Sequence, residues 1–126
     1  MSEQPILTTG EARVVSLSEQ TQFTANGIVS RTLFRCDRQR VVLFGFAAGQ
    51  ELSEHTTTCH ALVQILSGRS EWTLGPEPRT LAAGDFLYMP PNLAHSVRAT
   101  EPFSMLLTLL PDAPARMTTL GSKSPG

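Results

Sequence analysis

Short apolar runs separated by glycine and proline dominate the chain. Nine Gly and nine Pro are spread over 126 residues, and the apolar runs between them have the length of strands. No segment keeps an apolar period of 3.6 residues for three turns, and only residues 16–24 suit a helical turn. The pattern therefore predicts an all-β domain, a sandwich or a barrel. We expect strands over residues 12–17, 28–35, 40–47, 61–66, 70–74, 86–89, 95–99 and 103–109.

Alternation within these segments separates an inner from an outer face. We expect six side chains to line the inside: Ala61, Val63, Ile65, Val97, Met105 and Leu107. The outer face is also largely apolar, so either the N-terminal segment or a second copy of the chain has to cover it. Its main apolar residues are Leu62, Leu66, Leu106 and Leu110. Burying four leucines contributes roughly 6–12 kcal/mol before entropic costs, and we predict a homodimer.

Composition and charge narrow the function classes. We expect a single domain over residues 1–126, with a disordered tail over about 120–126. A net charge of −1 gives no sign of nucleic-acid binding. No apolar run approaches the roughly 18 residues of a membrane helix, and we expect no membrane association. The N-terminal residues lack the pattern of a signal peptide, which favours a cytoplasmic protein with Cys36 and Cys59 as reduced thiols.

The candidate chemistry lies with the three histidines of the chain. His55 and His60 stand five residues apart in EHTTTCHALVQILSG, and His95 lies in a second stretch, PPNLAHSVRA. Neutral imidazole is a good ligand for divalent transition metals. The question that the sequence raises is whether the three rings meet in the fold.

The two histidine stretches resemble the paired motifs of a small single-domain bacterial cupin, with a motif core over residues 49–99. In the first cupin motif a Gly is followed by two His, a Glu and a second Gly. Here Gly49, His55 and Gly68 keep that spacing, whereas Thr57 stands at the second His position and Ala61 at the Glu position.

The second motif is also kept in part. Gly84, Pro90 and His95 match it, while Asn92 stands where Gly is usual and Ala99 where Asn is usual. The resemblance implies a cupin-type double-stranded β-helix, which is a jelly-roll barrel, with a partly degenerate metal motif.

The resemblance also implies a ligand set. His55 and His95 occupy family ligand positions and are expected to face each other. Two ligands are few for tight binding of a metal, so we expect a third from His60, with Cys59 as a possible further ligand. Strict alternation directs His60 away from the face of Ala61, and a turn or bulge over residues 56–59 would be needed to swing it inward. The metal would be Fe, Zn, Mn, Ni or Cu.

Two function classes remain open. The first is a metal-dependent oxygenase, decarboxylase or isomerase acting on a small molecule in the barrel. The alternative is a non-catalytic, metal-free protein that binds or senses a small ligand. The missing Glu and second His favour the alternative somewhat. The fold does not decide between them, because it hosts many functions.

Overall fold

The computed structural model describes residues 4–112, which form one short helix and nine strands. The helix is α1 (Leu17–Gln20), capped by the Ser16 side chain, which accepts a hydrogen bond from the Glu19 amide. The strands are β1 (Ile28–Cys36), β2 (Gln39–Phe46), β3 (Glu51–His55), β4 (Cys59–Ser67), β5 (Arg69–Leu74), β6 (Glu77–Ala82), β7 (Phe86–Met89), β8 (His95–Ala99) and β9 (Phe103–Pro111).

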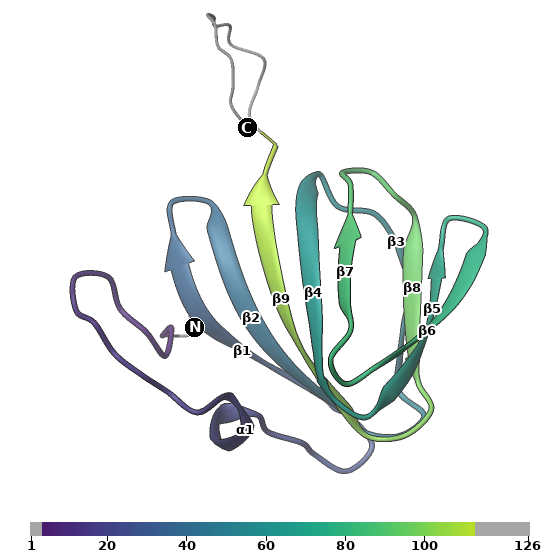
Figure 1. The fold of residues 1–126 in the computed structure, drawn as a ribbon, viewed down its shortest axis with the longest axis horizontal. Helices are drawn as coiled ribbons and strands as arrows, with labels where there is room; N and C mark the ends of the chain where they lie inside the picture. The colour runs from purple at the N-terminus through teal and green to yellow at the C-terminus, as the bar shows by residue number, and fades with distance from the viewer. Residues whose placement is uncertain (1–3, 113–126) are drawn as a thin grey trace, which may run out of the picture.

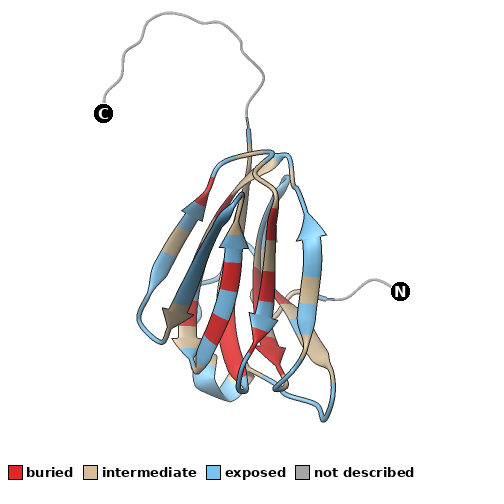
Figure 2. Cartoon of the chain, turned by 90° about the vertical axis from the view of Figure 1, so that its right-hand side faces the viewer, coloured by how far each residue is buried: buried red, intermediate tan, exposed pale blue. Residues whose placement is uncertain are grey.

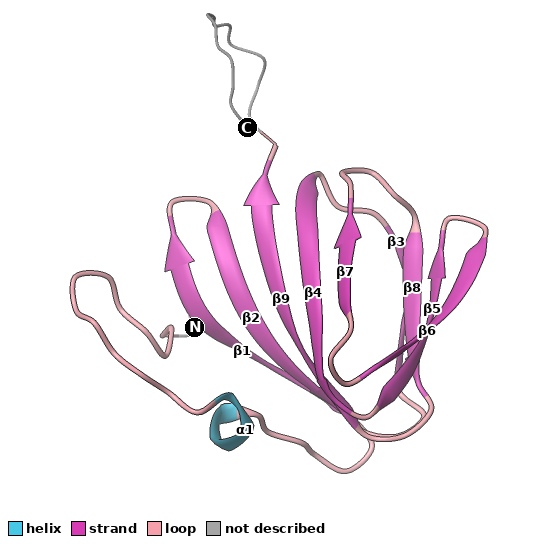
Figure 3. Cartoon of the chain, in the orientation of Figure 1, coloured by secondary structure: helices cyan, strands magenta, loops and turns pink. Residues whose placement is uncertain are grey.

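The strands form two antiparallel sheets that face each other (Figures 1 and 3). The larger sheet has the strand order β1-β2-β9-β4-β7, and the smaller has the order β3-β8-β5-β6. Apart from the hairpins β1–β2 and β5–β6, neighbouring strands are distant in sequence, as in a jelly roll, where the chain passes repeatedly from one sheet to the other. The fold is therefore the all-β double-stranded β-helix that the motifs predict.

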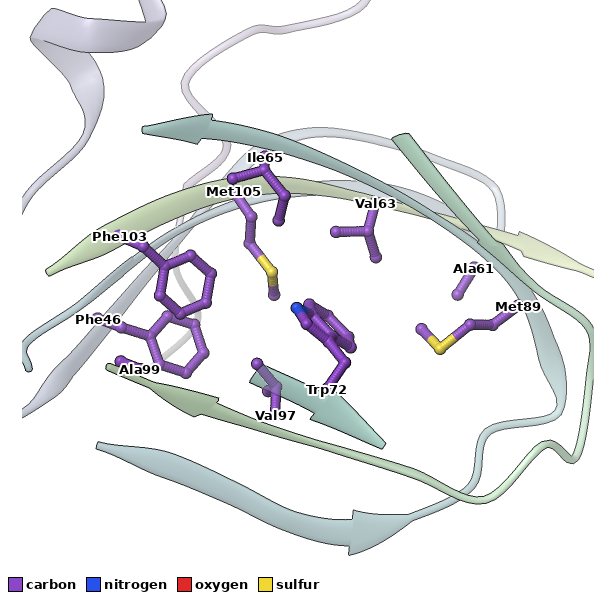
Figure 4. Close-up of a cluster of buried hydrophobic side chains, with 10 residues drawn as sticks. All are labelled: Phe46, Ala61, Val63, Ile65, Trp72, Met89, Val97, Ala99, Phe103 and Met105. Carbon is purple, nitrogen blue, oxygen red and sulfur yellow. The ribbon is translucent and has the colours of Figure 1, made fainter. Parts of the chain in front are cut away.

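The core fills the space between the sheets. Buried and exposed residues alternate along the strands (Figure 2), because successive side chains point to opposite faces. At one end the rings of Phe46 and Phe103 stack with centroids 4.5 Å apart, and both residues are fully buried. Figure 4 shows the side chains of both sheets meeting around Trp72. The prediction of the inner face is confirmed for five buried residues: Ala61, Val63, Ile65, Val97 and Met105.

The N-terminal segment covers part of the outer face of the larger sheet. The amides of Ile6 and Leu7 donate to carbonyls of β1, at 3.1 and 2.8 Å. The segment passes so close to β2 that a Cβ atom on Gly45 would collide with the carbonyl oxygen of Gln22. Leu17 and Phe23 line an outer pocket of about 390 Å³ together with Leu66. The outer face was expected to be covered by the N-terminal segment or by a second copy of the chain, and the N-terminal segment covers part of it.

One expected strand is absent from the structure, and two strands that were not expected are present. Residues 12–17 contain no strand, and Val14 is 95% exposed. Strands β3 and β6 were not expected, because both are largely polar and exposed and give no apolar alternation. They are held by backbone hydrogen bonding to β8 and β5. The expected disordered tail, 120–126, lies outside the described residues. Within residues 4–112, no helix has the length and apolar character that a membrane span requires.

Candidate functional site

His55 and His95 lie directly opposite each other in the smaller sheet. They are partners in the register of β3 with β8, and their ring centroids are 4.3 Å apart. His95 is buried, with 6% of its surface exposed, whereas His55 is exposed. The sequence prediction that these two histidines face each other is therefore confirmed as a matter of geometry.

A β-bulge places His55 in this position. Leu52 pairs with Val97, and a regular ladder would then put Glu54 opposite His95. The register instead shifts between Leu52 and His55, so that one extra residue is accommodated and His55 becomes the partner of His95. Bulges re-aim side chains in this way. Sequence reasoning missed the bulge, because the run ELSEH contains no glycine or proline to mark it.

The loop before β8 fixes the position of His95. Asn92 has a positive φ of 71°, a conformation that Asn tolerates better than most residues, which explains how it replaces the usual Gly of the motif. The backbone N–H of Asn92 donates to the carbonyl of Thr57 at 2.7 Å. The loop that precedes His95 is thereby tied to the connection between β3 and β4.

Each ring of the pair is oriented by a hydrogen bond to the backbone carbonyl two residues before it. The Nδ1 atom of His55 is 2.8 Å from the carbonyl oxygen of Ser53, and that of His95 is 2.9 Å from the carbonyl oxygen of Leu93. A carbonyl only accepts, so each Nδ1 carries the proton and donates. In the neutral rings both Nε2 atoms therefore have a free lone pair. Backbone bonds of this type orient the imidazoles that bind metals in proteins.

Burial favours the neutral form of His95. Desolvation lowers the pKa of His95 below its ordinary value of 6.5, and the nearby His55 lowers it further. The hydrogen bond to the Leu93 carbonyl acts in the opposite direction but does not cancel the effect. At neutral pH the imidazole of His95 is therefore unprotonated at Nε2 and available as a base or a ligand.

The two histidines line a small pocket of about 120 Å³ between the sheets. The rest of its wall is apolar, and five of these wall residues are drawn in Figure 4. Among residues 4–112, no carboxylate lines this pocket. The wall consists of Phe44, Leu52, Val63, Trp72, Met89, Val97, Met105 and Leu107. The pocket is smaller than the roughly 300–1,000 Å³ typical of sites for drug-sized molecules, so it suits a ligand of few atoms.

The structure does not bring His60 to this pair. Its Nδ1 is 2.8 Å from the hydroxyl of Tyr88 and its Nε2 is 2.9 Å from Oδ1 of Asp112, so both ring nitrogens are engaged. His60 could point to the inner face only if a bulge preceded it, but the pairing of β4 with β9 runs without a register shift from Cys59 to Ile65. Alternation then directs His60 to the outer face, opposite to its buried neighbour Ala61.

Cys59 does not complete the ligand set either. It is a free, partly buried cysteine on β4. Across residues 4–112, no three side chains of the types His, Cys, Asp and Glu are grouped so that they could hold a metal. The family motif explains why, because Thr57 and Ala61 stand where it has its second His and its Glu. The donor set thus fits a transition metal in part, with two imidazole nitrogens and the remaining positions open.

Comparison with known families agrees with this fold and motif pattern. Two facing antiparallel sheets, with a histidine from each of two paired strands at a pocket between them, define a barrel protein of the jelly-roll class. The family model "Cupin domain" matches residues 42–109, more than half of the chain, and the chain belongs to this family.

Solved structures show the same relationship. A conserved protein of unknown function from Streptococcus pyogenes is 30% identical, with a TM-score of 0.77, over 90% of this chain and 98% of that one. A cupin superfamily protein from Desulfitobacterium hafniense is 28% identical, with a TM-score of 0.75, over 82% and 94% of the two chains. No curated protein matches the chain.

Proposed function

We propose that the barrel binds a small, largely apolar molecule beside His55 and His95, and that the two imidazoles hold a divalent transition metal. The observation that carries the proposal is the matched orientation of the two rings. Each Nδ1 is held by a backbone carbonyl, and each Nε2 is left with a free lone pair. Both residues also line the same pocket.

The remaining wall of the pocket supports the binding of an apolar group. Trp72 is held in place because its indole N–H donates to the hydroxyl of Ser70 at 2.8 Å, so its ring faces the pocket as a fixed apolar surface. The apolar walls exclude water around the buried His95, which strengthens polar interactions at this residue. The volume limits the bound group to a few heavy atoms, with the rest of any larger molecule outside.

A bound metal would supply Lewis-acid polarisation of a polar group on the ligand. The chain itself contributes the two nitrogen ligands and leaves the other coordination positions to water or to the bound molecule, as in open rather than structural metal sites. Oxygenase, decarboxylase or isomerase chemistry remains a hypothesis at this site. Residues 4–112 place two imidazoles and no carboxylate at the pocket, so proton transfer by these residues would depend on an imidazole.

Metal analysis tests the proposal against the metal-free alternative. Purified protein is dialysed separately against Fe, Zn, Mn, Ni and Cu, and the bound metal is measured by elemental analysis. The proposal expects about one equivalent of at least one metal, and none in the double variant His55→Ala/His95→Ala. No bound metal under any of these conditions would favour the alternative, a non-catalytic barrel that binds a small ligand.

The homodimer remains a prediction. Leu62, Leu66, Leu106 and Leu110 are all partly buried within the single chain, and Leu66 lines the pocket beneath the N-terminal segment. The apolar surface left for a second copy is therefore smaller than the sequence alone indicates. Sedimentation velocity at micromolar concentration would decide, since a dimer gives twice the mass of the chain.

A further inference from the structure

Three polar side chains form a hydrogen-bonded chain on the outer face of the larger sheet. His60 lies on β4, Tyr88 on the neighbouring β7, and Asp112 directly follows β9 on the other side of β4. Tyr88 pairs with Leu62, so it is a diagonal neighbour of His60, and Leu110 pairs with His60. These three strands run side by side in Figure 1.

The chemistry of the three groups fixes the direction of the hydrogen bonds. A carboxylate only accepts, so Nε2 of His60 donates to Asp112 at 2.9 Å. Neutral imidazole then has its lone pair on Nδ1, and this atom accepts from the hydroxyl of Tyr88 at 2.8 Å. The rings of His60 and Tyr88 lie nearly parallel, with centroids 5.9 Å apart. A base is thus in contact with the phenol and is itself oriented by a carboxylate, the arrangement that activates nucleophiles.

The phenol is accessible and has an apolar surround. Tyr88 is 50% exposed, and Phe86, on the same side of β7, is 64% exposed. Leu62 and Leu110 flank the cluster and are partly exposed. A molecule with an apolar chain can therefore lie on this face with its reactive end at the phenol oxygen.

We propose that Tyr88 is a nucleophile that accepts an acyl group from activated esters or thioesters with apolar acyl chains. The Oη atom of Tyr88 forms a bond to the acyl carbon, and its proton passes to Nδ1 of His60. The bond from the acyl carbon to the leaving oxygen or sulfur breaks, and the leaving group departs with its electron pair and takes up a proton from His60 or water. The product is an ester of Tyr88. Asp112 is a positioning residue that holds the His60 ring with Nδ1 toward the phenol.

The experiment is simple because Tyr88 is the only tyrosine of the chain. The full chain, with Cys36→Ser to remove the exposed thiol, is treated with p-nitrophenyl butyrate at pH 7.5. Release of nitrophenolate is followed by absorbance, and the modified residue is found by peptide mass spectrometry. The expected result is one butyryl group on Tyr88, formed at least about tenfold faster in the folded protein than in the same chain unfolded in urea.

Variants separate the roles. Tyr88→Phe should remove the modification, and His60→Gln should slow it at least about tenfold, which is modest for general-base catalysis because the site is exposed. Asp112→Asn should slow it several-fold, and Asp112→Glu should restore the rate, a rescue that a merely structural role would not give. Circular dichroism checks the fold of each variant. The proposal is overturned if the label is found only on cysteine or histidine, if the folded and unfolded chains react equally fast, or if no label forms.

Discussion

The inner histidine pair and the outer histidine use the same side chain in opposite ways. His55 and His95 each donate from Nδ1 to a backbone carbonyl, which leaves the lone pair of Nε2 free. His60 has both nitrogens engaged by side chains. A ring with one free lone pair can bind a metal, whereas a ring held by a carboxylate on one side can take up the proton of a phenol on the other. The difference comes from the face of the sheet on which each residue lies, and one bulge in β3 decides it for His55.

The largest effect is expected from removing one member of the pair. His95→Ala or His55→Ala leaves a single imidazole, so binding of Zn²⁺ or Ni²⁺ should fall below detection in equilibrium dialysis. His60→Ala is the matched control, since it removes the third histidine from the outer face. It should change the affinity less than about twofold. An equal loss in all three variants would mean that the two sites are not separate.

A gain of affinity is expected from restoring the family motif. Thr57 stands at the second His position, so Thr57→His should supply a third imidazole and raise metal affinity at least about tenfold, or about 1.4 kcal/mol. The neighbouring Thr58→His is the control and should have little effect. Calorimetric titration with Zn²⁺ measures both. Equal affinities for the two variants would show that position 57 does not face the pair.

The two regions should also differ in how they link stability to pH. The pKa of His95 is lowered in the folded chain, so below its ordinary value of 6.5 the unfolded chain binds more protons at this residue. The contribution of His95 to stability is therefore complete above about pH 6.5 and declines as the pH falls toward the lowered pKa. Urea midpoints with a chelator present should drop from pH 7.5 to 5.5, and less so in His95→Gln. An identical drop in both proteins would contradict the assignment.

The smallest effect is expected at the outer histidine. His60 and Asp112 are substantially exposed, with 33% and 60% of their side chains accessible. Exposed contacts contribute about 0.2–1 kcal/mol even when both partners are charged, so loss of the hydrogen bond from the neutral His60 ring in Asp112→Asn should lower the free energy of unfolding by no more than about 1 kcal/mol. Urea unfolding at pH 7 measures this. A larger loss of unfolding free energy would mean that the cluster serves to stabilise the end of β9 rather than to react.

The fold was predictable because the chain keeps the glycine, proline and histidine spacing of the two cupin motifs, and because apolar alternation marks the strands of the core. Strands β3 and β6 were not, because their hydrogen bonds to β8 and β5 do not depend on the identity of their polar side chains. The partners of His60 were equally hidden. Tyr88 and Asp112 are 28 and 52 residues away in sequence, and only the order of β7, β4 and β9 brings them to one face.

The most direct test of the central claim is nitrogen NMR of the three histidine rings during a titration with Zn²⁺. In the metal-free protein at pH 7.5, His55 and His95 should both be protonated at Nδ1 and unprotonated at Nε2. Added Zn²⁺ should shift the Nε2 resonances of these two residues together, to an end point of one equivalent, and leave His60 unchanged. The account would be contradicted if Zn²⁺ shifted neither Nε2, or if His60 responded with the pair.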